Sequence, residues 1–314
     1  MGRPAGLLRA LLITLLIIAC VFLIVILPIK IVMSPQTSKP PPPREMKWLE
    51  QTPTSTEKPR ESLRERATRT NVMYSGGPVM AGTTSVYAIF WEPTGNVEQH
   101  YNGLIGRYFN DVGGSTLYRI ARQYKQANGG FPVDAVLAGA WNDTRTYHAN
   151  PLLDSDIQQE VTHAQQVNDW HSSLNNLFFV FTERNEDLCT DRTHSMCASN
   201  GYCAYHSNFG KNSLYAIVPY SASFECDDSG GPNRNDADQS IDSISHELME
   251  SVTDPLGNAW IDSGGNEIAD KCVDDFGSLN AQGANVVWNA HPYRVQKEWD
   301  NQTRSCRLTP ASLL

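Results

Sequence analysis

The sequence predicts an α/β fold in which a mixed β-sheet is flanked by helices and stabilised by disulfides. Short apolar runs typical of buried strands alternate with longer segments of helical periodicity, and six cysteines lie in the C-terminal half. Hydrophobic residues make up 40% of the 314 residues and charged residues 19%. This composition supports a packed core and excludes wholesale disorder.

The elements of the fold are expected in a definite order. Thr84–Trp91 is rich in β-branched and aromatic residues and stops before Pro93, which favours a buried strand. Apolar spacing from Asp154 onwards predicts a helix that begins near this residue. Further strands are expected at residues 177–181, 214–218, 285–288 and 293–295, and helices at 97–112, 115–126, 154–171 and 240–253.

The N-terminus does not resemble a globular domain. Residues 10–29 contain no charged side chain, and about 20 apolar residues cross the roughly 30 Å hydrocarbon core of a bilayer. Arg3 and Arg9 precede this segment, so residues 1–9 are expected in the cytoplasm and the rest of the chain outside. We therefore expect a single-pass cell-membrane protein with one N-terminal signal anchor. A cleaved signal peptide and a lipoprotein modified at Cys20 are the alternatives.

A linker is expected to follow the anchor. Residues 30–72 are rich in proline, and residues 34–70 hold seven of the chain's 18 prolines, including the run Pro40–Pro43. Such a composition buries too little apolar surface to fold and favours extended polyproline II structure. Residues 73–314 are then expected to form one extracellular domain.

Cysteine usage agrees with export. An even number of cysteines in an exported domain favours three disulfides, whose pairing the sequence leaves open. A zinc knuckle would need close CxxC pairs, which the sequence lacks. The six candidates are Cys189, Cys197, Cys203, Cys226, Cys272 and Cys306.

The charge distribution points to metal cations rather than nucleic acid. The chain has 25 basic and 34 acidic residues, a formal charge of −9, which disfavours binding to nucleic acid. Between residues 225 and 275, 14 acidic residues stand against only Arg234 and Lys271.

An HExxE motif lies within this acidic region. On a helix His246 and Glu250 share one face, so both can bind one metal ion. Glu247 lies where zincin metallopeptidases place the general base that activates a metal-bound water. The motif therefore favours a zincin-like fold with an active-site helix, although Glu250 stands where the usual motif has a second histidine.

A third metal ligand has to come from outside the helix. Glu267 follows at the distance at which thermolysin-like zincins place a ligand, and Asp270 could orient His246 from behind. One histidine with two carboxylates should bind zinc less selectively and tolerate harder divalent ions, calcium included. The alternative is an acidic helix whose Glu247 and Glu250 face water.

Two neighbouring patterns are weaker. Residues 226–232 resemble the GDSGGP segment of trypsin-like proteases, but Asp227 replaces the glycine of the oxyanion hole. The carboxylates from Asp236 to Glu247 have EF-hand spacing, yet Ile241 occupies the position that requires glycine. A polar turn and a helix are the expected structures, with a different calcium site left open.

Several segments in one order resemble the Exordium-like (phosphate-induced protein) family, extracellular proteins of plants with relatives in bacteria. They are Tyr74–Met80 (YSGGPVM), Phe90-Trp91, Cys203–Ser207 (CAYHS), Leu214–Pro219 (LYAIVP), His246–Glu250 with Asp254-Pro255 and Asn258–Trp260, and Glu267–Cys272 (EIADKC). The resemblance implies a secreted or cell-wall protein without a settled biochemical activity. It also implies that the acidic motif and Glu267 with Asp270 belong to one recurring arrangement. The membrane anchor, the linker and the spacing before His246 depart from the family pattern.

Two functions follow as hypotheses. The first is a metal-dependent hydrolase of peptides or cell-wall material, with zinc bound by His246, Glu250 and Glu267, and Glu247 as general base. His206 is a further catalytic candidate that could stabilise an oxyanion, or a structural histidine fixed by disulfides. The second is a non-catalytic cell-surface module that keeps the helix for structure or for a stabilising ion.

Overall fold

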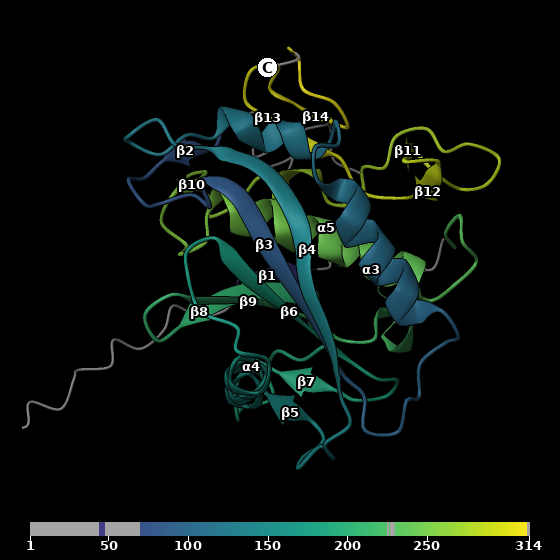
Figure 1. Ribbon diagram of the computed structural model, residues 1–314. Helices are drawn as coiled ribbons and strands as arrows, with labels where there is room; N and C mark the ends of the chain where they lie inside the picture. Colours follow the sequence, from purple (N-terminus) through teal and green to yellow (C-terminus); the bar gives the residue numbers. More distant parts are fainter. Residues whose placement is uncertain (1–43, 48–69, 225, 227–229, 313–314) are drawn as a thin grey trace, which may run out of the picture. The chain divides into compact units, whose positions relative to one another are not determined.

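The computed structural model describes residues 44–47, 70–224, 226 and 230–312, and for residues 44–47 the backbone alone (Figure 1). The expected membrane anchor at residues 10–29 lies outside this set. Within the described part of the chain, no helix is long and apolar enough to span a bilayer.

A six-stranded mixed sheet forms the centre of the fold, as Figure 1 shows. Its strands, in spatial order, are β1 (Arg44–Lys47), β8 (Tyr202–Phe209), β9 (Ser213–Val218), β6 (Asn176–Thr182), β3 (Gly82–Trp91) and β4 (Pro132–Asp143). The four strands from β9 to β4 are parallel, whereas β8 is antiparallel to β9 and β1 is antiparallel to β8. The mixed sheet that the sequence predicted is confirmed.

Helices cover both faces of this sheet. α3 (Tyr101–Val112) and α5 (Ala237–Thr253) lie on one face, and α4 (Asp154–Asn168) lies on the other (Figure 1). Side chains of a strand alternate between the two faces. Accordingly, Phe90 of β3 packs with the α3 and α5 side, whereas Ile89 packs with the α4 side.

Short elements complete the fold. Small two-stranded sheets pair β2 (Met73–Tyr74) with β10 (Trp260–Ile261), β5 (Leu152–Leu153) with β7 (Leu188–Cys189), β11 (Val286–Trp288) with β12 (His291–Tyr293), and β13 (Glu298–Asp300) with β14 (Ser305–Arg307). The described residues also form the 3₁₀ turns η1 (Tyr118–Gln123), η2 (Ser221–Ser223) and η3 (Asp270–Cys272). The helix expected at residues 115–126 is thus a six-residue 3₁₀ turn.

One element interrupts the linker that was expected to be disordered throughout. The backbone of Arg44–Lys47 pairs with β8, with Arg44 opposite His206. β8 would otherwise be the edge of the sheet, and an edge strand presents unpaired backbone groups to which an extended segment can add. The linker therefore touches the strand that carries one of the candidate site residues.

The three disulfides expected from the cysteine count are confirmed. They join Cys189 to Cys197, Cys203 to Cys226, and Cys272 to Cys306. The second connects β8 to the segment before α5, and the third connects η3 to β14. Two of them therefore constrain the segments that flank α5.

Candidate metal centre

Helix α5 carries ionisable side chains at every fourth position. Asp238, Asp242, His246 and Glu250 follow one another at this spacing, Asp254 comes next as the C-cap, and each of these side chains is at most 3% exposed. Residues four apart on a helix lie on the same face. The solvated acidic helix considered as an alternative is therefore not what forms, because the polar face of α5 is buried as fully as its apolar face.

His246 faces two carboxylates with one ring nitrogen. Its Nε2 lies 3.2 Å from Glu250 Oε1 and 3.6 Å from Asp270 Oδ1. Ligand atoms of these three residues lie within 4.8 Å of one another. One imidazole and two carboxylates at this separation can surround a divalent cation.

The opposite ring nitrogen of His246 is held by an amide. Gln296 Nε2 donates to the carbonyl of Ala269 at 2.8 Å, so its Oε1 is the atom that faces His246 Nδ1, at 3.1 Å. An amide oxygen can only accept, and Nδ1 must therefore carry the proton. In the neutral imidazole this leaves the Nε2 lone pair directed at Glu250 and Asp270, as a metal ligand requires.

His206 approaches α5 from β8. Its Nδ1 lies 2.9 Å from Glu247 Oε2 and 3.7 Å from Glu250 Oε2, and its Nε2 lies 3.7 Å from Glu267 Oε2. His206, Glu247 and Glu250 form a second group of ligand atoms within 4.8 Å of one another. Glu250 therefore belongs to both groups.

Backbone hydrogen bonds hold the segment that carries Glu267 and Asp270. The Asp270 side chain accepts from the Glu267 amide at 2.8 Å, and the Asp270 amide donates to Glu250 Oε1 at 3.0 Å. The carbonyl of Ile268 accepts from the Trp299 amide. Residues 267–270 are thus fastened to both α5 and β13, which places two further carboxylates beside the helix.

Burial and charge oppose each other at the two imidazoles. Burial lowers the pKa of His246, but the negative charges of Glu250 and Asp270 outweigh it and raise the pKa well above its ordinary value. Burial likewise lowers the pKa of His206, and its hydrogen bond with Glu247 reverses the effect. Burial, together with the charge of Asp270, raises the pKa of Glu250. The centre therefore concentrates negative charge where water does not screen it, and a cation would relieve this repulsion.

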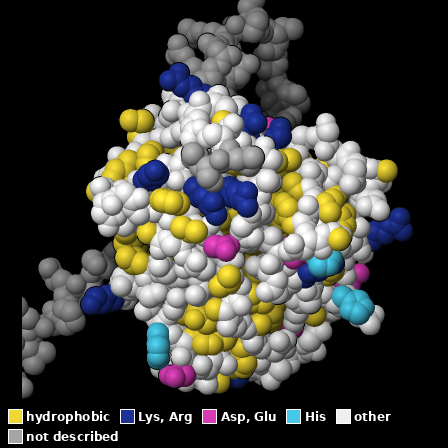
Figure 2. Space-filling model, turned by 45° about the horizontal axis from the view of Figure 1, so that its top comes forward, with side chains coloured by type: hydrophobic (Ala, Val, Ile, Leu, Met, Phe, Trp, Pro, Cys, Tyr) yellow, Lys and Arg dark blue, Asp and Glu magenta, His cyan; other side chains and the backbone are white. Residues whose placement is uncertain are grey.

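Acidic side chains are buried to an unusual extent in this protein. Among the described residues, 16 Asp and Glu side chains fall in the buried class, although charged residues are rarely buried unless paired. Figure 2 shows few Asp or Glu side chains on the face it presents, despite the acidic composition. Much of the acidity inferred from the sequence therefore lies inside the molecule.

The structure gathers all six residues singled out from the sequence. They are His206, His246, Glu247, Glu250, Glu267 and Asp270, and contacts of 2.9–3.7 Å connect each imidazole to carboxylates of the set. Asp270, expected to orient His246 from behind, lies on the Nε2 side instead, and Gln296 occupies the orienting position. Glu267 was expected beside His246, but its carboxylate lies near His206, with Oε2 3.7 Å from His206 Nε2.

Three buried residues of the centre were missed by sequence reasoning. Gln296 orients His246, and Asp242 Oδ1 accepts from the Gln296 amide at 2.8 Å. Glu298 is fully buried, and burial raises its pKa well above the ordinary value. Burial also raises the pKa of Asp242, to about 7. The four-residue spacing from Asp242 to His246 was a usable signal, whereas nothing in the sequence near Gln296 or Glu298 indicates a site.

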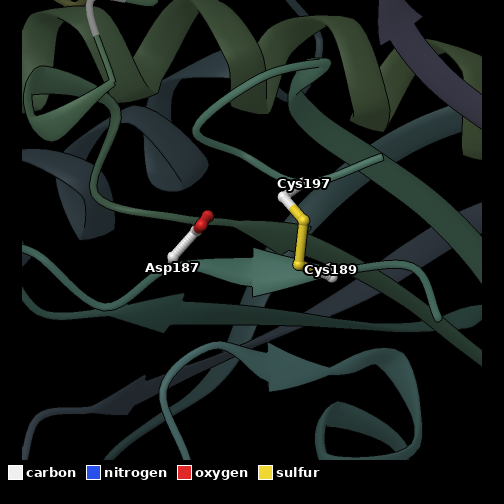
Figure 3. A group of neighbouring side chains, drawn as sticks. All are labelled: Asp187, Cys189 and Cys197. Atoms are coloured by element: carbon white, nitrogen blue, oxygen red, sulfur yellow. A yellow bond between two sulfur atoms is a disulfide. The ribbon is translucent and has the colours of Figure 1, made fainter. Parts of the chain in front are cut away.

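A third group of neighbouring candidate ligands is not a metal site. Asp187, Cys189 and Cys197 lie close together, but Figure 3 shows the two sulfur atoms joined in a disulfide. A disulfide provides no thiolate, which is the metal-binding form of cysteine. The Asp187 carboxylate accepts hydrogen bonds from the amide and hydroxyl of Ser199, so this side chain holds the neighbouring loop in place.

Comparison with known proteins gives one weak relationship. No protein-family model matches the chain. The chain is 24% identical over 242 residues to Protein EXORDIUM-like 5 of Arabidopsis thaliana, a match that covers 66% of this chain and 65% of that relative. The chain thus spans less than two thirds of the length of this relative. This distant homology supports a relationship to the Exordium-like family, and the three disulfides fit an extracellular domain.

Proposed function

We propose that this chain is an extracellular metal-binding protein whose buried centre holds a divalent cation that stabilises the fold, with zinc as the first candidate. The observation that carries the proposal is the excess of charge in the centre. Four carboxylates, those of Glu247, Glu250, Glu267 and Asp270, surround two imidazoles, and only Asp270 retains appreciable contact with water.

The charge balance favours a cation over an internal salt-bridge network. Even with both imidazoles protonated, the ionised carboxylates of Glu247, Glu250 and Asp270 would leave one uncompensated negative charge in the interior. For Glu247, Glu250 and Asp270, the ion pairs within the described residues are all with His206 or His246. Buried charges persist when they are paired or when they coordinate a metal. A divalent cation supplies the missing positive charge.

The geometry favours His246, Glu250 and Asp270 as the ligands of this cation. Gln296 sets the His246 tautomer that offers Nε2, and both carboxylates lie on that side of the ring. This assignment replaces the Glu267 expected from the sequence by Asp270. Mixed nitrogen and oxygen ligands suit zinc, and two carboxylates also admit manganese or calcium.

Elemental analysis tests the proposal directly. The full-length, disulfide-bonded chain, purified in mild detergent, should retain at least one equivalent of divalent metal or recover it after treatment with chelator and addition of Zn²⁺, Mn²⁺ or Ca²⁺. Glu250→Gln should lose that metal, because it removes a carboxylate shared by both ligand groups. Glu160→Gln is the matched control, since Glu160 is equally buried but lies on α4, across the sheet. Failure of the parent chain to bind any of the three ions would contradict the proposal.

A second candidate function is the metal-dependent hydrolase. It is favoured by the HExxE array and by the 23% exposure of the Asp270 side chain, which gives the centre one route to solvent. Here Glu247 would be the general base and His206 would stabilise an oxyanion. However, Glu247 is fully buried and hydrogen-bonded to His206, a position that suits a structural carboxylate better than a base that must reach water.

One substitution separates the two functions. Glu247→Gln keeps the shape of the side chain but removes its basicity. In a hydrolase it should abolish cleavage of peptide or cell-wall substrates while the cation held by His246, Glu250 and Asp270 stays bound. In a stabilising module the parent chain should show no such cleavage at all.

The proposed location is the outer face of a cell membrane. Disulfides and the Exordium-like relationship support an extracellular domain. The anchor at residues 10–29 remains a prediction from the sequence, and protease protection of the N-terminus in intact cells would test it.

A further inference from the structure

We infer that the centre holds two divalent cations that share Glu250 as a bridging ligand. The inference rests on the metal binding proposed above and deepens it, because it assigns His206 and Glu247 to a second cation position. The observation behind it is that Glu250 faces two different imidazoles with its two carboxylate oxygens.

The contacts of Glu250 have the geometry of a bridge. Its Oε1 lies 3.2 Å from His246 Nε2, whereas its Oε2 lies 3.7 Å from His206 Nδ1. Each imidazole has a second carboxylate beside the same nitrogen, Asp270 for His246 and Glu247 for His206. Each of the two groups therefore has one imidazole and two carboxylates, and Glu250 belongs to both.

The separations match those around real ions. Metal bonds to histidine nitrogen and carboxylate oxygen are about 2.0–2.2 Å long, so two ligands at the tetrahedral angle lie about 3.4 Å apart. The contacts of His246 with Glu250 and Asp270, at 3.2 and 3.6 Å, bracket this value. At His206 the separations are 2.9 and 3.7 Å, and the shorter is a hydrogen bond whose proton a cation would replace. Carboxylate-bridged ions in two-metal sites lie about 3.5–4 Å apart.

Unsatisfied polar atoms mark both positions. Glu247 Oε1 is buried and makes no hydrogen bond within the described residues. His246 Nε2 is also buried and makes no well-aligned hydrogen bond there, since the atoms it faces, at 3.2 and 3.6 Å, are the carboxylate oxygens of Glu250 and Asp270. One of these atoms belongs to each of the two groups. Buried polar atoms almost always have partners, so an unpartnered atom in a ligand group indicates a missing ligand. Because the two atoms lie in different groups, a single cation at either group would leave the other atom unsatisfied.

A competing arrangement has one cation in the His246 group and a protonated His206 that donates to Glu247. The two arrangements differ in the number of ions bound.

Manganese titration distinguishes these arrangements without any activity assay. The full-length chain, stripped with chelator and dialysed, is titrated with Mn²⁺ while bound metal is counted and electron paramagnetic resonance spectra are recorded. Two bridged ions should give two equivalents and a spectrum altered by exchange coupling between them. His206→Gln and His246→Gln should each bind one ion with the hyperfine pattern of isolated Mn²⁺. Glu160→Gln should behave as the parent, and circular dichroism verifies that each variant is folded.

The parent chain alone decides the inference, whether or not the variants fold. One equivalent of Mn²⁺, or two equivalents without coupling, would overturn the bridged pair and leave the proposed metal binding intact. No bound Mn²⁺, together with no bound Zn²⁺ or Ca²⁺, would overturn both. Two coupled ions support both.

Discussion

The Gln296 amide oxygen lies 3.1 Å from His246 Nδ1, on the opposite side of the ring from Glu250 and Asp270. Gln296 is itself held at its backbone by Asp242 and at its amide nitrogen by the carbonyl of Ala269. Gln296, 50 positions after His246, thus sets the ring orientation and the tautomer of this histidine.

Gln296→Ala should weaken metal binding without removing a ligand. Loss of a partner that orients a ligating histidine typically lowers metal affinity about 10- to 100-fold. Competition with a chromogenic chelator would measure the change. Gln123→Ala is the control, because Gln123 likewise donates its side-chain amide to a backbone carbonyl, but is only half-buried and lies in η1, away from the centre. Equal affinities in the parent and the Gln296 variant would contradict this positioning role.

The residues that α5 contributes to the centre could be predicted from the sequence, because the spacing of residues on one helix does not depend on the rest of the fold. His246 and Glu250 are one turn apart wherever the helix lies, and the spacing of the motif also brought Glu267 and Asp270 into consideration. Gln296 and Glu298 could not be predicted in this way. They reach the centre through the packing of β13 beside η3, a long-range contact to which no sequence period corresponds.

The sequence also predicted some strands of the central sheet and missed others, depending on how each strand is buried. The strands β3, β6 and β9 were predicted as continuous apolar runs, which are typical of parallel strands buried on both faces. β4 was missed because it lies at the edge of the sheet and alternates exposed with partly buried residues. β8 was missed because polar residues interrupt its buried run, and one of them is His206 of the centre. The residue that obscured the strand is a functional candidate.

Gly77→Ala should destabilise the fold, because Gly77 lies against a backbone. Its amide donates to the carbonyl of Asn258 at 2.9 Å, and a Cβ at this position would lie 2.6 Å from that oxygen. Two segments of the family resemblance, around Tyr74 and Trp260, are joined here. Overpacking of this kind costs about 1–3 kcal/mol, which urea unfolding would detect as a lower midpoint.

Gly103→Ala is the matched control for that substitution. Gly103 is exposed on α3, and a Cβ there would meet nothing within 4 Å. Alanine is favoured over glycine in a helix by about 1 kcal/mol, so this variant should be slightly more stable than the parent. Equal destabilisation by both substitutions would show that contact with Asn258 is not the cause.

Removal of the Cys272–Cys306 disulfide should weaken metal binding as well as stability. Cys272 closes the 3₁₀ turn that begins at Asp270, so the disulfide restrains one of the proposed ligands. Loss of a native disulfide costs about 2–5 kcal/mol in a small domain. The double variant Cys272→Ser/Cys306→Ser should have both a lower unfolding midpoint and a lower affinity for Zn²⁺.

The Cys189–Cys197 disulfide provides the comparison. Cys189 belongs to β7, which lies on the α4 side of the sheet (Figure 1), and the disulfide joins it to Cys197, so it restrains no residue of the centre. The variant Cys189→Ser/Cys197→Ser should therefore lose stability while its metal affinity, measured on the folded fraction, stays that of the parent. A similar loss of affinity in both double variants would indicate a general loosening of the fold.

The free energy of unfolding should decrease as the pH rises from about 5 to 8, because Glu160 ionises over this range only when the chain unfolds. Burial, together with the charge of Asp143, raises the pKa of Glu160 to about 8, even though Arg145 contacts both carboxylates. In the unfolded chain Glu160 ionises near its ordinary pKa of 4.5. Between these two values the folded state binds more protons than the unfolded state. The free energy of unfolding therefore decreases with pH, by at most about 1.4 kcal/mol per pH unit for one group.

Glu160→Gln isolates this contribution, because a neutral amide of the same shape cannot ionise. Urea unfolding of the parent and the variant at several values between pH 5 and 8.5 should give stability curves that converge at low pH and separate as pH rises, with the variant the more stable at the alkaline end. Glu160 lies across the sheet from the metal centre, on α4, so the difference between the curves should persist in chelator. Parallel curves would mean that Glu160 is ionised in the fold, held as a carboxylate by Arg145.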